Sequence, residues 1–235
     1  TAITLLILVS HAFAHMEISS PPPLRSKYNP NTNKDDIDYS MTSPLSNTGG
    51  GFPCKGYLSL LGTSQGKSVA SWAAGSSQSF SVVGSATHGG GSCQTSLSLD
   101  SGKTFRVIHS YTGGCPLSPS YNFKVPADTP ATQDAIFAWT WHNEIGDREM
   151  YMNCAVVNIL PPGNTNNKRE QVSFSSRPAM FEANIGNGCS TVEMFDVLYP
   201  NPGPDVTNGG SKTKSPIGSC GSLSSVGASG SYESS

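Results

Sequence analysis

Residues 135–160 read AIFAWTWHNEIGDREMYMNCAVVNIL, two strand-like runs on either side of a polar loop. The runs, residues 135–141 and 150–160, are rich in the β-branched and aromatic residues that favour extended chain. Similar runs occur at residues 79–83, 95–99, 104–110 and 193–198, with turn signals such as Gly89-Gly90-Gly91 between them. This spacing predicts an all-β fold, an immunoglobulin- or fibronectin-like β-sandwich with long loops, and short helices in the loops between Pro21 and Ser64.

The composition agrees with a β-rich domain. The 235 residues include 25 Gly and 17 Pro, and 36% of them are hydrophobic, which is too rich in loops for a helical bundle. Only 13% are charged and the formal net charge is -2. A nucleic-acid binder normally shows a basic excess, so that class is disfavoured. The length suits one mid-sized domain or two small ones.

The first fourteen residues, TAITLLILVSHAFA, have the pattern of a signal peptide. Their apolar run from Ile3 to Val9 is far shorter than the roughly 20 residues that span a bilayer. It is followed by Ala12-Phe13-Ala14, the small-x-small pattern after which signal peptidase cuts. We therefore expect residues 1–14 to be the remnant of a signal peptide and the protein to be secreted and extracellular. The alternative is a buried N-terminal strand.

Cleavage after Ala14 makes His15 the first residue of the mature chain. A free α-amine has a pKa of roughly 8, well below that of Lys, so it readily releases its proton to a metal. An N-terminal His therefore offers two nitrogens, the amine and Nδ1, and a second His would complete a planar set of three that suits copper. The alternative is that His15 stands there by accident of processing.

Six cysteines in a secreted chain imply three disulfides. None of them is spaced C-x-x-C, so a zinc ribbon or a thioredoxin-like site is disfavoured. Proximity in the sequence favours the pairs Cys93–Cys115 and Cys189–Cys220, which leaves Cys54–Cys154 as a long-range bridge. This connectivity is one of fifteen that six cysteines allow.

The C-terminal composition shifts to Pro, Gly and Ser from about Asn201, and residues after Cys220 are mostly Gly and Ser. We expect a catalytic domain over residues 15–204 and a flexible tail or linker over residues 205–235 that is tethered through Cys220. The tail either ends the protein or leads to a further module.

Two short segments hold the best candidates for chemistry. His88 follows a strand-like run and opens a Gly-rich loop that leaves its imidazole accessible. In an extended chain Glu149 and Tyr151, two residues apart, point to one face, as do Ala86 and His88. Each pair alone is a weak signal, because a Tyr on a strand is usually core and a Glu at a strand end is usually solvated.

Two further histidines are weaker candidates. His109 lies inside a strand pattern, which favours a packed or surface side chain. His142 follows Trp141 and opens the polar loop from Asn143 to Arg148, and it is a minor candidate for the site.

Together these segments resemble the auxiliary activity family 11 (AA11) lytic polysaccharide monooxygenases, secreted fungal copper enzymes that act on chitin. The likeness runs from His15 to about Pro204. The matching pieces are His15-Met16, Phe52-Pro53-Cys54-Lys55, Ala86 to Cys93, Phe137-Ala138-Trp139, Arg148 to Val157, Pro178 to Phe181, Ala183 to Cys189 and Pro200 to Gly203. An isolated His-Gly-Gly-Gly would be weak, but this ordered set is specific.

The resemblance implies roles for individual residues. His15, through its amine and Nδ1, and His88, through Nε2, would bind one copper ion per chain in a histidine brace. Tyr151 would occupy one axial side of the metal as a weak ligand, and Ala86 would crowd the other. Glu149 would hydrogen-bond near the metal or relay protons.

The resemblance also implies the reaction and the partners. Crystalline chitin would be cleaved oxidatively at the anomeric carbon, with peroxide or dioxygen as cosubstrate. Electrons would come from a small reductant or a flavohaem dehydrogenase. We expect a monomer with no nucleic-acid or membrane partner. Asp147, where many members have Asn, and the individual loop from Ser20 to Gly51 are departures, and the loop bears on substrate preference.

Two other functions stay in competition. The first is a non-catalytic secreted copper- or chitin-binding protein of the same fold, although a simple copper carrier has no need of Glu149 and Tyr151. The second is a hydrolase. The chain has no H-E-x-x-H motif of a zinc protease, and nothing in the sequence pairs two carboxylates across a glycosidic bond.

Overall fold

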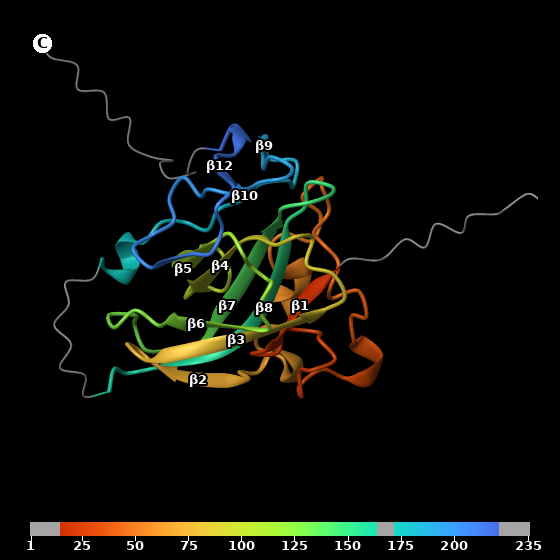
Figure 1. The fold of residues 1–235 in the computed structure, drawn as a ribbon. Coiled ribbons are helices and arrows are strands. Elements are labelled where there is room, and N and C mark those ends of the chain that lie inside the picture. The colour runs from red at the N-terminus through yellow and green to blue at the C-terminus, as the bar shows by residue number, and fades with distance from the viewer. Residues whose placement is uncertain (1–14, 164–171, 221–235) are drawn as a thin grey trace, which may run out of the picture.

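Two β-sheets packed face to face form the body of the protein, as a computed structural model of residues 15–163 and 172–220 shows (Figure 1). The smaller sheet has the order β1-β3-β6, with β1 at Met16–Ser20, β3 at Ser77–Gly84 and β6 at Ser120–Lys124. The larger sheet has the order β11-β5-β4-β7-β8-β2. Its strands are β2 Ala70–Ala73, β4 Gly91–Ser98, β5 Arg106–Thr112, β7 Thr132–Asn143, β8 Tyr151–Leu160 and β11 Val206–Asn208. The predicted all-β sandwich is confirmed.

Short elements decorate this body. The C-terminal segment adds two small pairings, β9 (Cys189–Ser190) with β13 (Ile217–Gly218) and β10 (Asp196–Val197) with β12 (Thr213–Lys214). The helices within the described residues are of 3-10 type: η1 Lys34–Asp36, η2 Cys54–Leu60, η3 Ser64–Gly66 and η4 Phe174–Ser176. No helix in the described ranges is long and apolar enough to cross a membrane.

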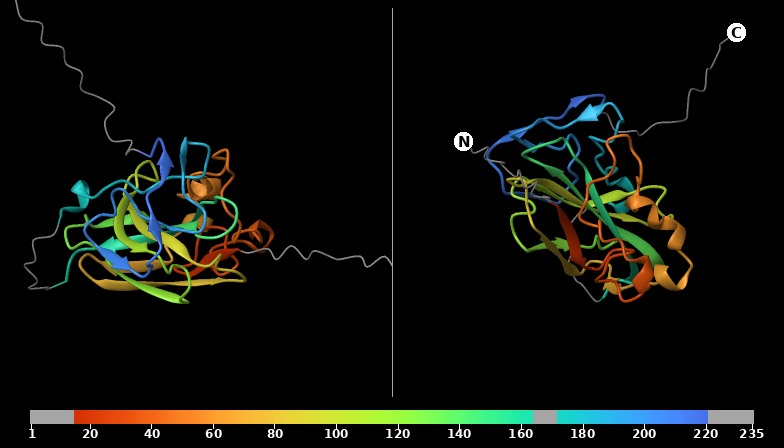
Figure 2. Two further views of the ribbon diagram at one scale, coloured as in Figure 1. Left: turned by 45° about the horizontal axis from the view of Figure 1, so that its top comes forward. Right: turned by 90° about the vertical axis from the view of Figure 1, so that its right-hand side faces the viewer.

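The six-stranded sheet is buried on both faces because each face has its own cover. Along β7, Phe137, Trp139 and Trp141 pack in the core between the two sheets, whereas Ile136 and Ala138 pack in a second core on the opposite face. That second core is covered by the loop around Cys54 and by the segment 172–220, which is cyan and blue in Figures 1 and 2. This double burial explains why every residue of β4 is buried.

Three disulfides cross-link the described part of the chain. They join Cys93 to Cys115 and Cys189 to Cys220, the two pairs that proximity in the sequence favoured, and Cys54 to Cys154, the long-range pair that was left. The last encloses a sequence separation of 100 residues and ties η2 to β8. No cysteine among the described residues is free.

The strands predicted from the sequence correspond to the long strands of the structure, and several short strands were not predicted. β1, β2 and β6 have five, four and five residues, and each lies at the edge of its sheet. Pairing with a longer strand from elsewhere in the chain stabilises them, and local composition does not reveal that partner. The run expected at 193–198 narrows to β10, which pairs only with the two-residue β12.

The segment after residue 204 differs in part from the expected flexible tail. Residues 206–208 form β11, which pairs in parallel with β5, and β12 and β13 follow before Cys220. Backbone pairing and the Cys189–Cys220 disulfide therefore hold this Gly- and Ser-rich stretch against the domain. The expected signal peptide, residues 1–14, and the end of the tail, residues 221–235, lie outside the described residues.

Candidate metal centre

His15 is positioned by the pairing of β1 with β3. Met16 pairs with Gly84, and the carbonyl of His15 accepts a hydrogen bond of 3.2 Å from the N–H of Ser85. A Cβ at Gly84 would overlap the carbonyl oxygen of His15 and the side chain of Met16, so only glycine permits this close approach. The pairing brings His15 to the end of β3, where the loop that carries His88 begins.

The loop that carries His88 is fastened to the loop between β7 and β8. The carbonyl of His88 accepts from the N–H of Ile145 at 3.0 Å, and the carbonyl of Gly90 accepts from the N–H of Glu144 at 3.2 Å. A Cβ at Gly146 would lie 3.4 Å from Nδ1 of His88, so this edge of the imidazole faces Gly146. The other ring nitrogen, Nε2, lies 3.4 Å from the hydroxyl oxygen of Tyr151.

Tyr151 lies between the two histidines. It begins β8, it is buried, and its ring stacks on Trp141 with centroids 4.3 Å apart. The ring of His15 lies 6.4 Å from the Tyr151 ring, and that of His88 lies 6.5 Å from it. β1, the loop after β3 and the start of β8 therefore converge on one point.

Glu149 completes this group. The Tyr151 hydroxyl donates a 2.7 Å hydrogen bond to Oε2 of Glu149, and this oxygen lies 3.8 Å from Nε2 of His88. Burial, and then the hydrogen bond to Glu149, raise the pKa of Tyr151, so the phenol stays protonated and donates. Glu149 precedes β8 rather than lying on it, yet its side chain still meets Tyr151 as the two-residue spacing predicted.

Three polar residues hold the backbone around Glu149, and the sequence did not indicate this role for them. The Glu149 N–H donates to Oδ1 of Asn143 at 3.2 Å, and the Glu149 carbonyl accepts from Nδ2 of Asn184 at 2.9 Å. Arg148 donates to the carbonyls of Asn143, Glu144 and Gly146. An Asn or Arg in a Gly-containing loop is too common for the sequence to single these residues out.

The other histidines are placed elsewhere. His109 lies on β5, where it stacks on Tyr111 and hydrogen-bonds to Thr207 of β11. His142 is buried in contact with Phe181 and Tyr199, on the face of β7 opposite to Trp141. The half-buried Ala86 lies two residues before His88, and no described contact tests its expected role.

The donor set fits a copper ion. Two imidazoles converge, and nitrogen donors of this kind suit copper. No group of three or more His, Cys, Asp or Glu that could hold a metal occurs within residues 15–163 and 172–220. A third donor therefore has to come from another group, and the main-chain nitrogen of His15 is the nearest by chain position. It becomes an amine only when the chain begins at His15.

A match to the G-x-S-x-G pattern of serine hydrolases occurs at residues 62–66, GTSQG. In those enzymes the Ser lies on a sharp turn from a strand to a helix. Here Ser64 begins the three-residue η3, and the preceding element is η2 rather than a strand. The structural context of a nucleophile elbow is therefore missing.

Comparison with known proteins decides the family. No protein-family model matches the chain. The chain is 52% identical over 194 residues to an "AA11 family lytic polysaccharide monooxygenase A" of Aspergillus fumigatus, and the match covers 83% of this chain and 85% of that protein. The chain belongs to the AA11 family of lytic polysaccharide monooxygenases. It is thus a copper-dependent enzyme that oxidises polysaccharides with the help of an external reductant.

Two further AA11 proteins extend the comparison. The chain is 36% identical to an AA11 family lytic polysaccharide monooxygenase of Aspergillus oryzae and 35% identical to monooxygenase B of Aspergillus fumigatus, over 85% and 81% of this chain. It spans about half the length of these two AA11 relatives, 49% and 48%. Among solved structures, a Bacillus amyloliquefaciens CBM33 in complex with Cu(I) aligns over 62% of this chain and the whole of its own, with a TM-score of 0.40 and 12% identity.

Proposed function

We propose that this AA11 enzyme is a secreted monomer that cleaves crystalline chitin oxidatively at the anomeric carbon, with one copper ion held by His15 and His88. The observation that carries the proposal is the convergence of these two histidines on Tyr151, whose hydroxyl donates to Glu149. Membership of the AA11 family supports copper-dependent oxidation, and the substrate and the metal ligands are the proposed part.

The orientation of the His88 ring supports this choice of copper ligands. In a mature chain that begins at His15, the amine and Nδ1 of this residue would supply two donors. Nε2 of His88, which faces Tyr151 while Nδ1 faces Gly146, would supply the third. When bound there, copper would supply one-electron chemistry with dioxygen or peroxide.

Tyr151 and Glu149 would control protons beside the metal. The raised pKa of Tyr151 keeps its phenol neutral, and a neutral phenol beside His88 would at most be a weak ligand of copper. Oε2 of Glu149 accepts the phenol proton in a hydrogen bond and lies near His88. The Glu149 side chain is 22% exposed, so water can reach it from outside the group.

The surface beside the His88 loop is suited to a flat polysaccharide. Ile145 packs over Gly89 and Leu117 over Gly90, and these two apolar side chains are 41% and 55% exposed. Exposed apolar groups beside a reactive centre can lie on the apolar face of a sugar ring. They support a docked crystalline chain rather than a substrate drawn into a cleft.

The test is mass spectrometry of soluble products released from chitin by copper-loaded protein that begins at His15, with ascorbate and peroxide. We expect chitooligosaccharide aldonic acids that vanish when EDTA is added. His88→Ala should abolish both tight copper binding and product, whereas His109→Ala, a histidine outside the site, should change neither. Native oligosaccharides alone would instead indicate hydrolysis. If a copper-loaded sample released no product, cleavage of chitin would be refuted. The remaining explanations would be that the enzyme acts on another glycan, or that it is a non-catalytic copper- or chitin-binding protein.

A further inference from the structure

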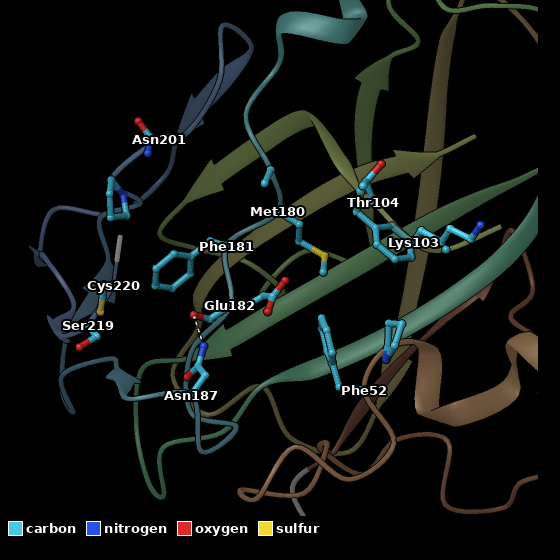
Figure 3. Close-up of a pocket in the computed structure, with 15 residues that line it drawn as sticks. Phe52, Lys103, Thr104, Met180, Phe181, Glu182, Asn187, Asn201, Ser219 and Cys220 are labelled. Atoms are coloured by element: carbon cyan, nitrogen blue, oxygen red, sulfur yellow. Dashed lines mark hydrogen bonds between the residues drawn. The ribbon is translucent and has the colours of Figure 1, made fainter. Parts of the chain in front are cut away.

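A cavity of about 640 Å³ lies on the face of the six-stranded sheet opposite to Tyr151 (Figure 3). Its wall combines the loop before η2, the turn before Phe105, the segment 179–182 and the end of the described chain at Cys220. None of the residues that converge on the candidate copper site lines it. Its volume falls in the range of pockets that hold small organic molecules.

The wall is mostly apolar and aromatic. Phe52, Phe105 and Phe181 line it together with Met180 and Pro200. Phe105, Phe181 and Met180 are almost fully buried, Phe105 and Met180 in the second core and Phe181 in a separate cluster with Tyr199, so packing fixes their positions. Aromatic rings present a negative π-face, which attracts a cation that has been removed from water.

One carboxylate points into this apolar space. In Figure 3, Glu182 lies between Phe181 and Phe52, below the sulfur of Met180. No ion pair or side-chain hydrogen bond among the described residues engages its carboxylate, although Lys103 lines the same cavity. Burial raises the pKa of Glu182, and no charged neighbour contributes to the shift. A partly desolvated carboxylate without a partner is costly unless a cation joins it.

We propose that this cavity is a binding site for a small organic cation with an apolar body, held by the carboxylate of Glu182 and by the faces of Phe52 and Phe181. The carboxylate and the aromatic rings both favour a positively charged ligand. The apolar wall favours a ligand with an apolar body over a bare metal ion. A neutral ligand would leave the carboxylate without a partner, and an anion would be repelled by it. The site is independent of the copper centre and of the reaction proposed there.

The test is calorimetric titration of the full, copper-loaded chain at pH 7 with three probes of different charge. Benzyltrimethylammonium is the cation and has no lone pair to bind copper, benzyl alcohol is the neutral probe, and 3-phenylpropionate is the anion. We expect the cation to bind at least about 10-fold more tightly than the alcohol, and the anion not to bind. Equal binding of cation and alcohol, or no binding of the cation at millimolar concentration, would overturn the proposal.

Variants and contacts locate the site. Glu182→Gln should remove the preference for the cation, whereas Asp35→Asn, the same charge change at an exposed residue, should leave it unchanged. Nuclear Overhauser effects in the unaltered protein should connect the probe's methyl groups to the methyl of Met180. Effects to Tyr151 instead, or a preference that survives in Glu182→Gln, would contradict the assignment.

Discussion

Replacing His142 with Phe is expected to make the protein less sensitive to acid. The His142 ring is buried, with ring centroids 5.1 Å from Phe181 and 6.1 Å from Tyr199, and neither of its nitrogens has a hydrogen-bond partner in the structure. Burial, and then the nearby charge of Arg148, lower the pKa of His142 to about 3. The folded protein therefore holds this imidazole neutral at every pH above about 3.

The size of the effect follows from the two pKa values. The unfolded chain protonates His142 below its ordinary pKa of about 6.5, and the folded protein only below about 3. Between these values the unfolded state binds more protons, so the free energy of unfolding falls as the pH falls. The loss from this residue amounts to about 2 kcal/mol at pH 5 and about 3 kcal/mol at pH 4, relative to pH 7.

The assay is urea unfolding at pH 7, 5 and 4 for the unaltered protein and for His142→Phe. Because Phe does not titrate, the variant should lose less stability between pH 7 and pH 4, by about 3 kcal/mol. Any cost of fitting the larger ring is the same at each pH and cancels from this difference. His109→Phe is the comparison, since His109 is only half-buried and hydrogen-bonded, and its effect should be smaller. If the free energy of unfolding fell equally between pH 7 and pH 4 in the unaltered protein and in His142→Phe, the reasoning would be refuted.

Three further predictions concern the site and the fold. Gly84→Ala should displace the start of β1 and weaken copper binding at least 10-fold by calorimetry, because a Cβ there would overlap His15; an unchanged affinity would contradict the steric argument. Tyr151→Phe should keep copper binding but lower the yield of oxidised product. It should also lower the free energy of unfolding by about 2 kcal/mol, because Glu149 loses its hydrogen bond from the phenol. Full activity of the variant would exclude a role for the Tyr151 hydroxyl in the reaction. Replacing Cys54 and Cys154 with serine should lower the free energy of unfolding in urea by about 4–5 kcal/mol, because the disulfide closes a loop of 100 residues. A loss below about 1 kcal/mol would contradict this estimate of loop closure.

Several features could be read from local sequence because the physics behind them is local. The strand within 150–160 could be predicted from its own β-branched and aromatic residues, because this preference is a property of the run itself. The spacing of Glu149 and Tyr151 likewise brought their side chains together, although the strand begins only at Tyr151. The ordered motifs from His15 to about Pro204 indicated the family, which the comparison confirmed.

Other features depend on which segments lie against one another. The edge strand β1 exists through its pairing with β3, and His142 is buried because the segment that carries Phe181 covers its face of β7. The cavity around Glu182 likewise forms where segments far apart in the sequence meet. The sequence by itself indicated the long strands, a cysteine pairing that the structure has, and the family. Only the tertiary structure decided the site geometry, the burial of His142 and the cavity, because distances between remote segments depend on sheet register and on packing across both faces.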